Sequence, residues 1–137
     1  MNTAFTANPS KKPNAELLAC LFETTCDLAF DSVMITSAKA LEGGYPIIFV
    51  NQAFTMMTGY TADEIIGKSP GILQGPDTDP AVIERLASDL EAGRTFHGKA
   101  VNYRKDGSQF MLEWKVSPVK DAWGGTVNLV SVQRESK

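Results

Sequence analysis

Apolar residues follow helical spacing near the start of the chain and alternate with polar ones near its end. Between residues 15 and 30, leucines and phenylalanines are interspersed with acidic residues, as in an amphipathic helix. Asn14 directly precedes this stretch and is suited to cap it. Two strand-like stretches follow at residues 32–39 and 46–51, and the second is strongly apolar. We therefore expect one helix and then two strands in the first part of the chain.

Short helical segments separated by helix-ending signals occupy residues 53–67. Gly59 is placed to end the first segment. Thr61 and Glu64 have the spacing of a capping box for the second. Farther on, Asp79 and the proline after it form a strong helix start, with the aspartate as cap and the proline in the first turn. A longer helix is therefore expected to end at the glycine at position 93.

Three further strands are predicted near the end of the chain, at residues 96–105, 108–119 and 126–134. The tight-turn sequence Lys-Asp-Gly connects the first two, and Trp-Gly-Gly connects the last two. The order is thus one helix, two strands, several helices and three strands. Strands from both ends of the chain then share one antiparallel sheet, which makes this an α+β domain.

Alternation along these strands separates an interior face from an outer face of the sheet. The outer face is expected to show Met111, Val101, Tyr103, Val130 and Val132. An apolar outer face needs a cover. The amphipathic N-terminal helix is the only spare element, and it could cover its own sheet or that of a partner. The pattern therefore suggests a homodimer formed through the N-terminal helix and the outer sheet face.

Two amides, Asn102 and Gln133, fall on the otherwise apolar interior face. Buried amides need hydrogen-bond partners, which backbone groups or water can supply. Alternatively, both project into a pocket and read the edge of a flat heteroaromatic ligand, since an amide both donates and accepts. The remaining walls would be apolar: Leu73, Ile83, Leu86, Leu90, Ala100, Leu112, Trp114, Val116 and Leu129. If these side chains fill the space themselves, the same set is simply a core.

Size and charge limit the classes of function. The chain has 137 residues, 43% of them hydrophobic, with a formal net charge of −3 at pH 7, which fits one globular domain without a nucleic-acid-binding stripe. No apolar run approaches the roughly 18 residues of a membrane span, and the N-terminus lacks the core of a secretory signal. We expect a cytoplasmic protein with a disordered tail at residues 1–13, a flanking helix at 14–30 and one domain at 31–137.

The residues with reactive side chains do not assemble into a catalytic or metal site. Gly-Lys-Ser at residues 67–69 lacks the earlier glycine of a phosphate-binding loop, since Ala62 stands there. His97 is the only histidine and has no recognisable nucleophile beside it. Cys20 and Cys26 share one predicted helix, about 240° apart, without histidine neighbours. We expect no catalytic residues, no metal site and no enzymatic activity.

Four blocks of the sequence resemble the PAS superfamily, in the order that the family has them. They are FVNQAFTMMTGYTADEIIGK, GILQGPDTDPA, NYRKDGSQF and SPVKDAWGGTVNLVSVQ, and the resemblance covers roughly residues 29–134. It implies a five-stranded antiparallel sheet, with helices between its second and third strands and a flanking N-terminal helix. Such domains serve as sensory or dimerisation modules that control a kinase, a diguanylate cyclase or a transcription regulator.

The second block is also similar to the light-sensing LOV branch of the family, which binds flavin mononucleotide (FMN). Matching positions retain Thr36, Leu73, Gln74, Asn102 and Gln133. By this resemblance, Asn102 and Gln133 contact the flavin ring, and the amide of Gln133 relays the signal.

Several LOV positions differ in this chain. Pro70 stands where the branch has its reactive cysteine, between Ser69 and Gly71 in place of asparagine and arginine. Ala87 stands in place of a second phosphate-holding arginine, and Leu112 in place of a second ring-reading asparagine. A cysteine adduct is therefore excluded at this position. Each lost charge-assisted contact weakens phosphate binding by about 1.5–3 kcal/mol.

Taken together, these features predict a sensory PAS module without cysteine photochemistry. Its ligand is undetermined: FMN, flavin adenine dinucleotide (FAD), another small molecule, or none. In the last case the domain is a cofactor-free interaction or dimerisation module. The residues expected to line the ligand site are Thr36, Leu73, Gln74, Ile83, Leu86, Leu90, Asn102, Leu112, Trp114, Val116, Leu129 and Gln133.

Overall fold

The computed structural model describes residues 14–39 and 44–137 of the chain, so the tail predicted at residues 1–13 lies outside the described residues. The helices are α2 (Ala15–Leu28), α3 (Gln52–Thr58), α4 (Ala62–Ile65) and α5 (Pro80–Glu91), with a 3-10 turn, η1 (Pro70–Leu73). The strands are β1 (Ser32–Ser37), β2 (Ile47–Val50), β3 (Phe96–Tyr103), β4 (Gln109–Lys120) and β5 (Thr126–Glu135). The predicted order is confirmed, and η1 is an element that the apolar pattern does not indicate.

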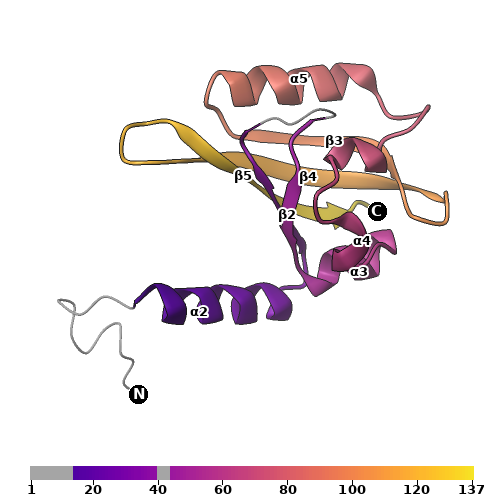
Figure 1. Cartoon of the computed structure of the whole chain (residues 1–137). Coiled ribbons are helices and arrows are strands. Elements are labelled where there is room, and N and C mark those ends of the chain that lie inside the picture. Colours follow the sequence, from indigo (N-terminus) through magenta and orange to yellow (C-terminus); the bar gives the residue numbers. More distant parts are fainter. Residues whose placement is uncertain (1–13, 40–43) are drawn as a thin grey trace.

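The strands form one antiparallel sheet in the order β2-β1-β5-β4-β3. The last strand therefore lies in the middle of the sheet and joins the first hairpin to the second. Helices α3, α4 and α5 lie between β2 and β3 in sequence (Figure 1). The expected α+β fold, with its five-stranded sheet and its N-terminal helix, is confirmed.

The helix starts follow the predicted capping signals. Asn14 accepts a hydrogen bond from the backbone N–H of Leu17 at 2.8 Å, and Thr61 and Glu64 form the complete capping box of α4. Gly59 ends α3 in the left-handed region, with φ of 82°, where a glycine is favoured.

The first helix ends earlier than predicted. Helix α2 stops at Leu28, since Ala29 is already extended with φ of −69° and ψ of 137°. Phe30, assigned to the helix by its apolar character, is instead fully exposed at 101%. The chain needs this extended connection to enter β1 at Ser32. None of the helices in residues 14–39 and 44–137 is long and apolar enough to cross a membrane.

Buried side chains on the inner side of the sheet form two apolar clusters. One comprises Met34, Ile47, Val50, Phe54, Ile65 and Leu73, and the other comprises Phe96, Ala100, Phe110, Leu112, Trp114 and Val116. The alternation predicted for β4 is thus confirmed, because its residues from Phe110 to Val116 are buried at every second position.

The outer face of the sheet has an apolar part and a charged part. Val132 of β5 and Met111 of β4 are 43% and 41% exposed, as expected for an uncovered face. Beside them, Glu113 of β4 pairs with neighbours on β3 and β5. Tyr103, predicted for the same open face, is half-buried, and its hydroxyl accepts a hydrogen bond from the backbone N–H of Asp77 at 2.8 Å.

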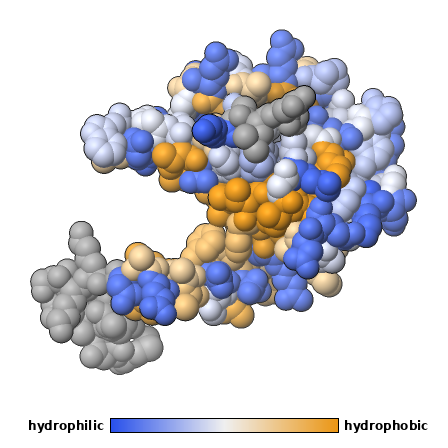
Figure 2. All heavy atoms as spheres, viewed as in Figure 1, coloured by the Kyte–Doolittle hydropathy of each residue, from blue (hydrophilic) through white to orange (hydrophobic). Residues whose placement is uncertain are grey.

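Helix α2 extends away from the sheet (Figure 1). The aromatic ring of Phe22 on α2 packs against that of Phe49 on β2, with centroids 5.0 Å apart. Leu17 and Leu18 of the same helix are 43% and 51% exposed. Apolar surface lines the recess between this helix and the rest of the domain (Figure 2). Helix α2 therefore contacts its own sheet at Phe49 and leaves Met111 and Val132 of the outer face exposed.

Asn51 ties the end of α2 to the domain. Its side-chain N–H groups donate to the backbone carbonyls of Cys26 and Asp31 at 2.8 and 3.0 Å. Its side-chain oxygen accepts from the backbone N–H of Val33 at 2.8 Å and of Phe54 at 3.1 Å. One buried amide thus joins α2, β1 and α3.

Candidate functional site

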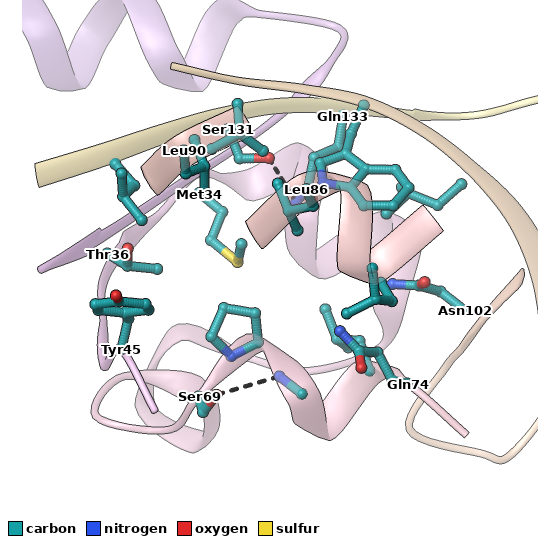
Figure 3. A pocket seen from close by; sticks show the side chains of 18 of the residues that line it. Met34, Thr36, Tyr45, Ser69, Gln74, Leu86, Leu90, Asn102, Ser131 and Gln133 are labelled. Atoms are coloured by element: carbon teal, nitrogen blue, oxygen red, sulfur yellow. Dashed lines mark hydrogen bonds between the residues drawn. The ribbon is translucent and has the colours of Figure 1, made fainter. Parts of the chain in front are cut away.

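A cavity of about 340 Å³ lies between the inner face of the sheet, α5 and η1 (Figure 3). Such a volume is at the small end of the range for ligand pockets. Every residue predicted for the ligand site lines it: Thr36, Leu73, Gln74, Ile83, Leu86, Leu90, Asn102, Leu112, Trp114, Val116, Leu129 and Gln133. The structure thus brings these residues together, and their contact with a ligand stays a prediction.

The lining also includes residues that the prediction left out. Ala100, expected in the wall, is instead packed in the second apolar cluster. Ser131 lies on the same side of β5 as Leu129 and Gln133, so the strand alternation could have identified it. The other additional lining residues are Met34, Tyr45, Ser69, Pro70, Gly71 and Ala87.

Gln133 is held by two serine hydroxyls. The hydroxyl of Ser32 donates to its Oε1 at 3.1 Å, and its Nε2 donates to the hydroxyl oxygen of Ser131 at 2.9 Å. A hydroxyl can both donate and accept. The amide of Gln133 can therefore flip, exchanging its oxygen and nitrogen, and still bond both serines. One of these serines, Ser32, is the first residue of β1, the strand that follows α2.

Two other polar side chains at the cavity lack such partners. Thr36 is 4% exposed, and its Oγ1 has no hydrogen-bond partner among the described residues. Asn102 is 6% exposed, and its amide makes no side-chain hydrogen bond within residues 14–39 and 44–137. Because an unsatisfied buried polar group costs free energy, both sites are suited to a bound polar atom.

The perturbed carboxyl groups of the domain lie outside the cavity. A hydrogen bond from Lys105 lowers the pKa of Glu64 on α4 to about 2. The pKa of Asp106 is lowered by its hydrogen bonds with Ser108. No group of metal-binding residues occurs in the described part of the chain. None of these carboxyl groups is among the residues that line the cavity.

The cysteines are also remote from the cavity. The position at which LOV domains have their reactive cysteine is occupied by Pro70, which begins η1 and lines the pocket. The hydroxyl of Ser69, just before it, accepts a hydrogen bond from the N–H of Gly71 at 3.3 Å. Cys20 is exposed and Cys26 is buried, and both lie on α2. No thiol is among the cavity residues that the structure describes.

His97 lies on the outer face of the sheet. Its Nε2 is 2.8 Å from Oε2 of Glu113, and its side chain is 54% exposed. Arg134 of β5 binds the other oxygen of Glu113 at 3.3 Å. These contacts form a surface ion-pair cluster, and the cluster contains no nucleophile.

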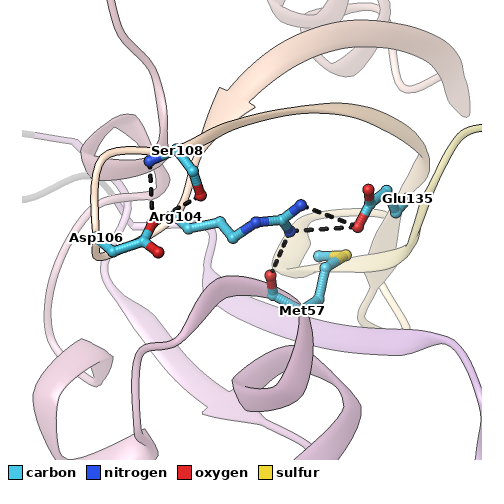
Figure 4. A network of polar contacts seen from close by, with 5 residues as sticks. All are labelled: Met57, Arg104, Asp106, Ser108 and Glu135. Atoms are coloured by element: carbon cyan, nitrogen blue, oxygen red, sulfur yellow. Dashed lines mark hydrogen bonds and ion pairs between the residues drawn. The ribbon is translucent and has the colours of Figure 1, made fainter.

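A polar network holds the end of β5 against α3 (Figure 4). The guanidinium of Arg104 donates to the carbonyl of Met57 at 2.9 Å and to the carboxylate of Glu135 at 3.2 Å. It also lies over the ring of Phe110, 4.5 Å from the centroid. Arg104 thereby links β5 to α3 at Glu135, two residues after Gln133.

Known proteins share this fold and much of this sequence. A blue-light-activated histidine kinase of Brucella anthropi is 41% identical over 112 residues, which are 82% of this chain and 22% of the relative. Phototropin-2 of rice (Oryza sativa subsp. japonica) is 39% identical over 90 residues, covering 66% of this chain and 10% of the relative. The chain thus spans at most about a fifth of these relatives.

Solved structures agree. The LOV domain of a blue-light-activated histidine kinase from Erythrobacter litoralis superposes with a TM-score of 0.71 at 31% identity, covering 77% of this chain and 94% of that one. A structure described as "Flavin Analogue Sheds Light on Light-Oxygen-Voltage Domain Mechanism" gives 0.75 at 30%, covering 90% and 87%. The family model described as "PAS domain" matches residues 31–135. The chain belongs to the PAS domain family, with close similarity to LOV domains.

Proposed function

We propose that this domain is a non-enzymatic sensory input module that binds a flat heteroaromatic ligand of the flavin type and relays its state through a dimer. The ligand site is the cavity between the sheet and α5. The module acts in the cytoplasm and controls an effector such as a kinase, a diguanylate cyclase or a transcription regulator.

The observation that carries the proposal is the pair of buried polar groups inside apolar walls. Thr36 Oγ1 is buried in the lining without a hydrogen-bond partner among the described residues, the Asn102 amide is buried in the same lining, and Trp114 offers a broad aromatic wall. A flat ring with donors and acceptors on its edge satisfies both requirements. A self-filled core would leave these polar groups without compensation.

The relatives support the class of ligand and of output. The description of one similar structure names a flavin analogue, and two relatives are named blue-light-activated histidine kinases. Here Pro70 lines the pocket and both cysteines lie on α2, so we propose sensing without a cysteine adduct. A change in the redox state of the ring would act through the amide of Gln133.

The relay would run from Gln133 to α2. A reorientation of the Gln133 amide would change its hydrogen bond with Ser32, because the hydroxyl of Ser32 donates to Oε1 of Gln133 at 3.1 Å. Helix α2 ends four residues before Ser32. The side chain of Asn51 donates to the carbonyl of Cys26 in α2 and to that of Asp31, which directly precedes Ser32. The contacts are continuous from the cavity to the helix.

The proposed dimer uses the exposed residues of α2 and the apolar part of the outer sheet face. Leu17 and Leu18 are about half exposed, as are Val132 and Met111 on the sheet. A two-fold axis brings the helix of each copy to the other copy, so one contact covers both sets in both subunits. Such burial is the main driving force for association.

A visible absorbance spectrum of the freshly purified protein tests the ligand. We expect flavin-type bands, either at once or after incubation with flavins and removal of the excess. Thr36→Val with Asn102→Leu should abolish the bands and leave the fold, measured by circular dichroism, intact. A preparation that stays colourless in both conditions refutes flavin binding.

Sedimentation velocity tests the dimer. Leu18→Lys should produce monomers, whereas Glu23→Lys, which places the same side chain on the other side of α2 with an even larger change of charge, should leave the dimer intact. An unchanged oligomeric state after Leu18→Lys, or after deletion of residues 1–28, contradicts this interface.

A cofactor-free interaction module is the second candidate. The uncovered apolar residues of α2 and of the sheet favour it, since they require a partner whether or not the cavity is filled. Dimerisation together with a colourless protein would support this candidate over the first.

A further inference from the structure

The cavity carries no charged side chain among the described residues that line it. Its polar groups are hydroxyls and amides. A dianionic phosphate taken into such a site would lose hydration without meeting a cation, which is costly.

The arginines of the chain are all engaged elsewhere. Arg85 lies 4.7 Å from the ring centroid of Phe96 and donates to the carbonyl of His97 at 3.0 Å. Arg94 pairs with Asp89. The other two, Arg104 and Arg134, hold Glu135 and Glu113. Recruiting any of them to the pocket would break an existing contact.

The wall formed by η1 and α5 is made of small or uncharged residues. Pro70 and Gly71 of η1 and Ala87 of α5 line the cavity. None of these side chains can donate a hydrogen bond to an anionic tail. Recognition is left to uncharged polar side chains of the lining, among which Thr36 and Asn102 are buried and the Thr36 hydroxyl has no partner among the described residues.

We propose that the pocket selects an uncharged ligand, a flat heteroaromatic compound without a phosphate group. This inference rests on the proposed function, because it names the ligand class of the same cavity. Binding energy comes from ring burial against Trp114 and the leucines and from edge hydrogen bonds to Thr36 and Asn102. A phosphate attached to such a ring contributes nothing or weakens binding.

Titration calorimetry with three flavins tests the inference, using FMN, riboflavin, which lacks the phosphate, and lumichrome, which lacks the whole side chain. We expect riboflavin and lumichrome to bind at least as tightly as FMN. FMN binding that is tenfold or more tighter than riboflavin binding overturns the inference and leaves the proposed function standing. Binding of none of the three overturns the proposed function, and this inference with it.

Two variants make the test specific to charge at the cavity. Ala87→Arg places a cation in the lining and should tighten FMN binding by about tenfold or more, with riboflavin unchanged. Ser88→Arg adds the same charge to α5 at a position outside the lining and should change neither. If Ala87→Arg tightens riboflavin and FMN equally, the lack of charge is not what governs selection, and the inference fails.

Discussion

Replacing Asn51 by alanine should destabilise the domain more than any surface substitution in it. Asn51 is 2% exposed, and its amide makes four hydrogen bonds to backbone atoms. Its N–H groups donate to the carbonyls of Cys26 and Asp31, and its oxygen accepts from the N–H groups of Val33 and Phe54. Alanine removes all four. The N–H groups of Val33 and Phe54 and the carbonyl of Asp31 then lose this partner, and the carbonyl of Cys26 keeps only the N–H of Ala29.

The expected loss follows from those bonds. A net contribution of about 1 kcal/mol for each gives about 4 kcal/mol in the free energy of unfolding. That is a large share of the roughly 5–15 kcal/mol typical of a domain. With an urea dependence of about 2 kcal/mol per molar, the unfolding midpoint should fall by about 2 M.

Urea unfolding followed by tryptophan fluorescence measures this loss, because Trp114 is buried in the native state. Asn14→Ala is the matched control, since Asn14 makes one exposed capping bond to Leu17 and its loss should cost about 1 kcal/mol. Equal midpoints for Asn51→Ala and Asn14→Ala would refute the reasoning that the buried network holds α2 in place.

Three further predictions concern other parts of the domain. Thr36→Val should stabilise the ligand-free protein by about 1 kcal/mol, because it removes an unpartnered buried hydroxyl; a lower urea midpoint contradicts this. Gly75→Ala should destabilise by about 1–3 kcal/mol, since a Cβ there would lie 2.7 Å from ring atoms of Tyr103; the thermal midpoint measures it, and an unchanged midpoint argues against close packing. The pKa of Glu113 is lowered from its usual 4.5, mainly by the hydrogen bond from His97. The folded state is therefore stabilised above pH 4.5, and this stabilisation is lost as the pH falls below that value. His97→Gln should therefore flatten the fall in thermal midpoint over that acidic range, and an unaltered slope would exclude this pairing as its source.

Much of the fold was accessible from the sequence, because its signals are local. Alternation in β4 identified the buried face, and the caps at Thr61 and Asp79 marked helix starts correctly. Most of the residues that line the cavity were also grouped together, since alternation and helical spacing state which side chains face inward. Thr36 and Gln74 came instead from the resemblance to LOV domains.

The remaining features depend on contacts between distant segments. The partners of Asn51 lie up to 25 residues away and are backbone atoms, which carry no sequence signal. Tyr45 reaches the cavity from the segment before β2, and its direction depends on the path of the chain there. Phe30 is apolar yet exposed, so composition alone placed it in the wrong element.

The central position of β5 has a consequence for how the chain folds. Ser32 and Gln133 are bonded across 101 positions of sequence, and β5 is the sole link between the β1–β2 hairpin and the β3–β4 hairpin. Closing so large a loop has an entropic cost that local contacts do not offset, and folding dominated by such contacts is slow. In a growing chain the two pairs of strands are therefore unjoined until β5 is available, and only then can the sheet, the cavity and the link to α2 form together.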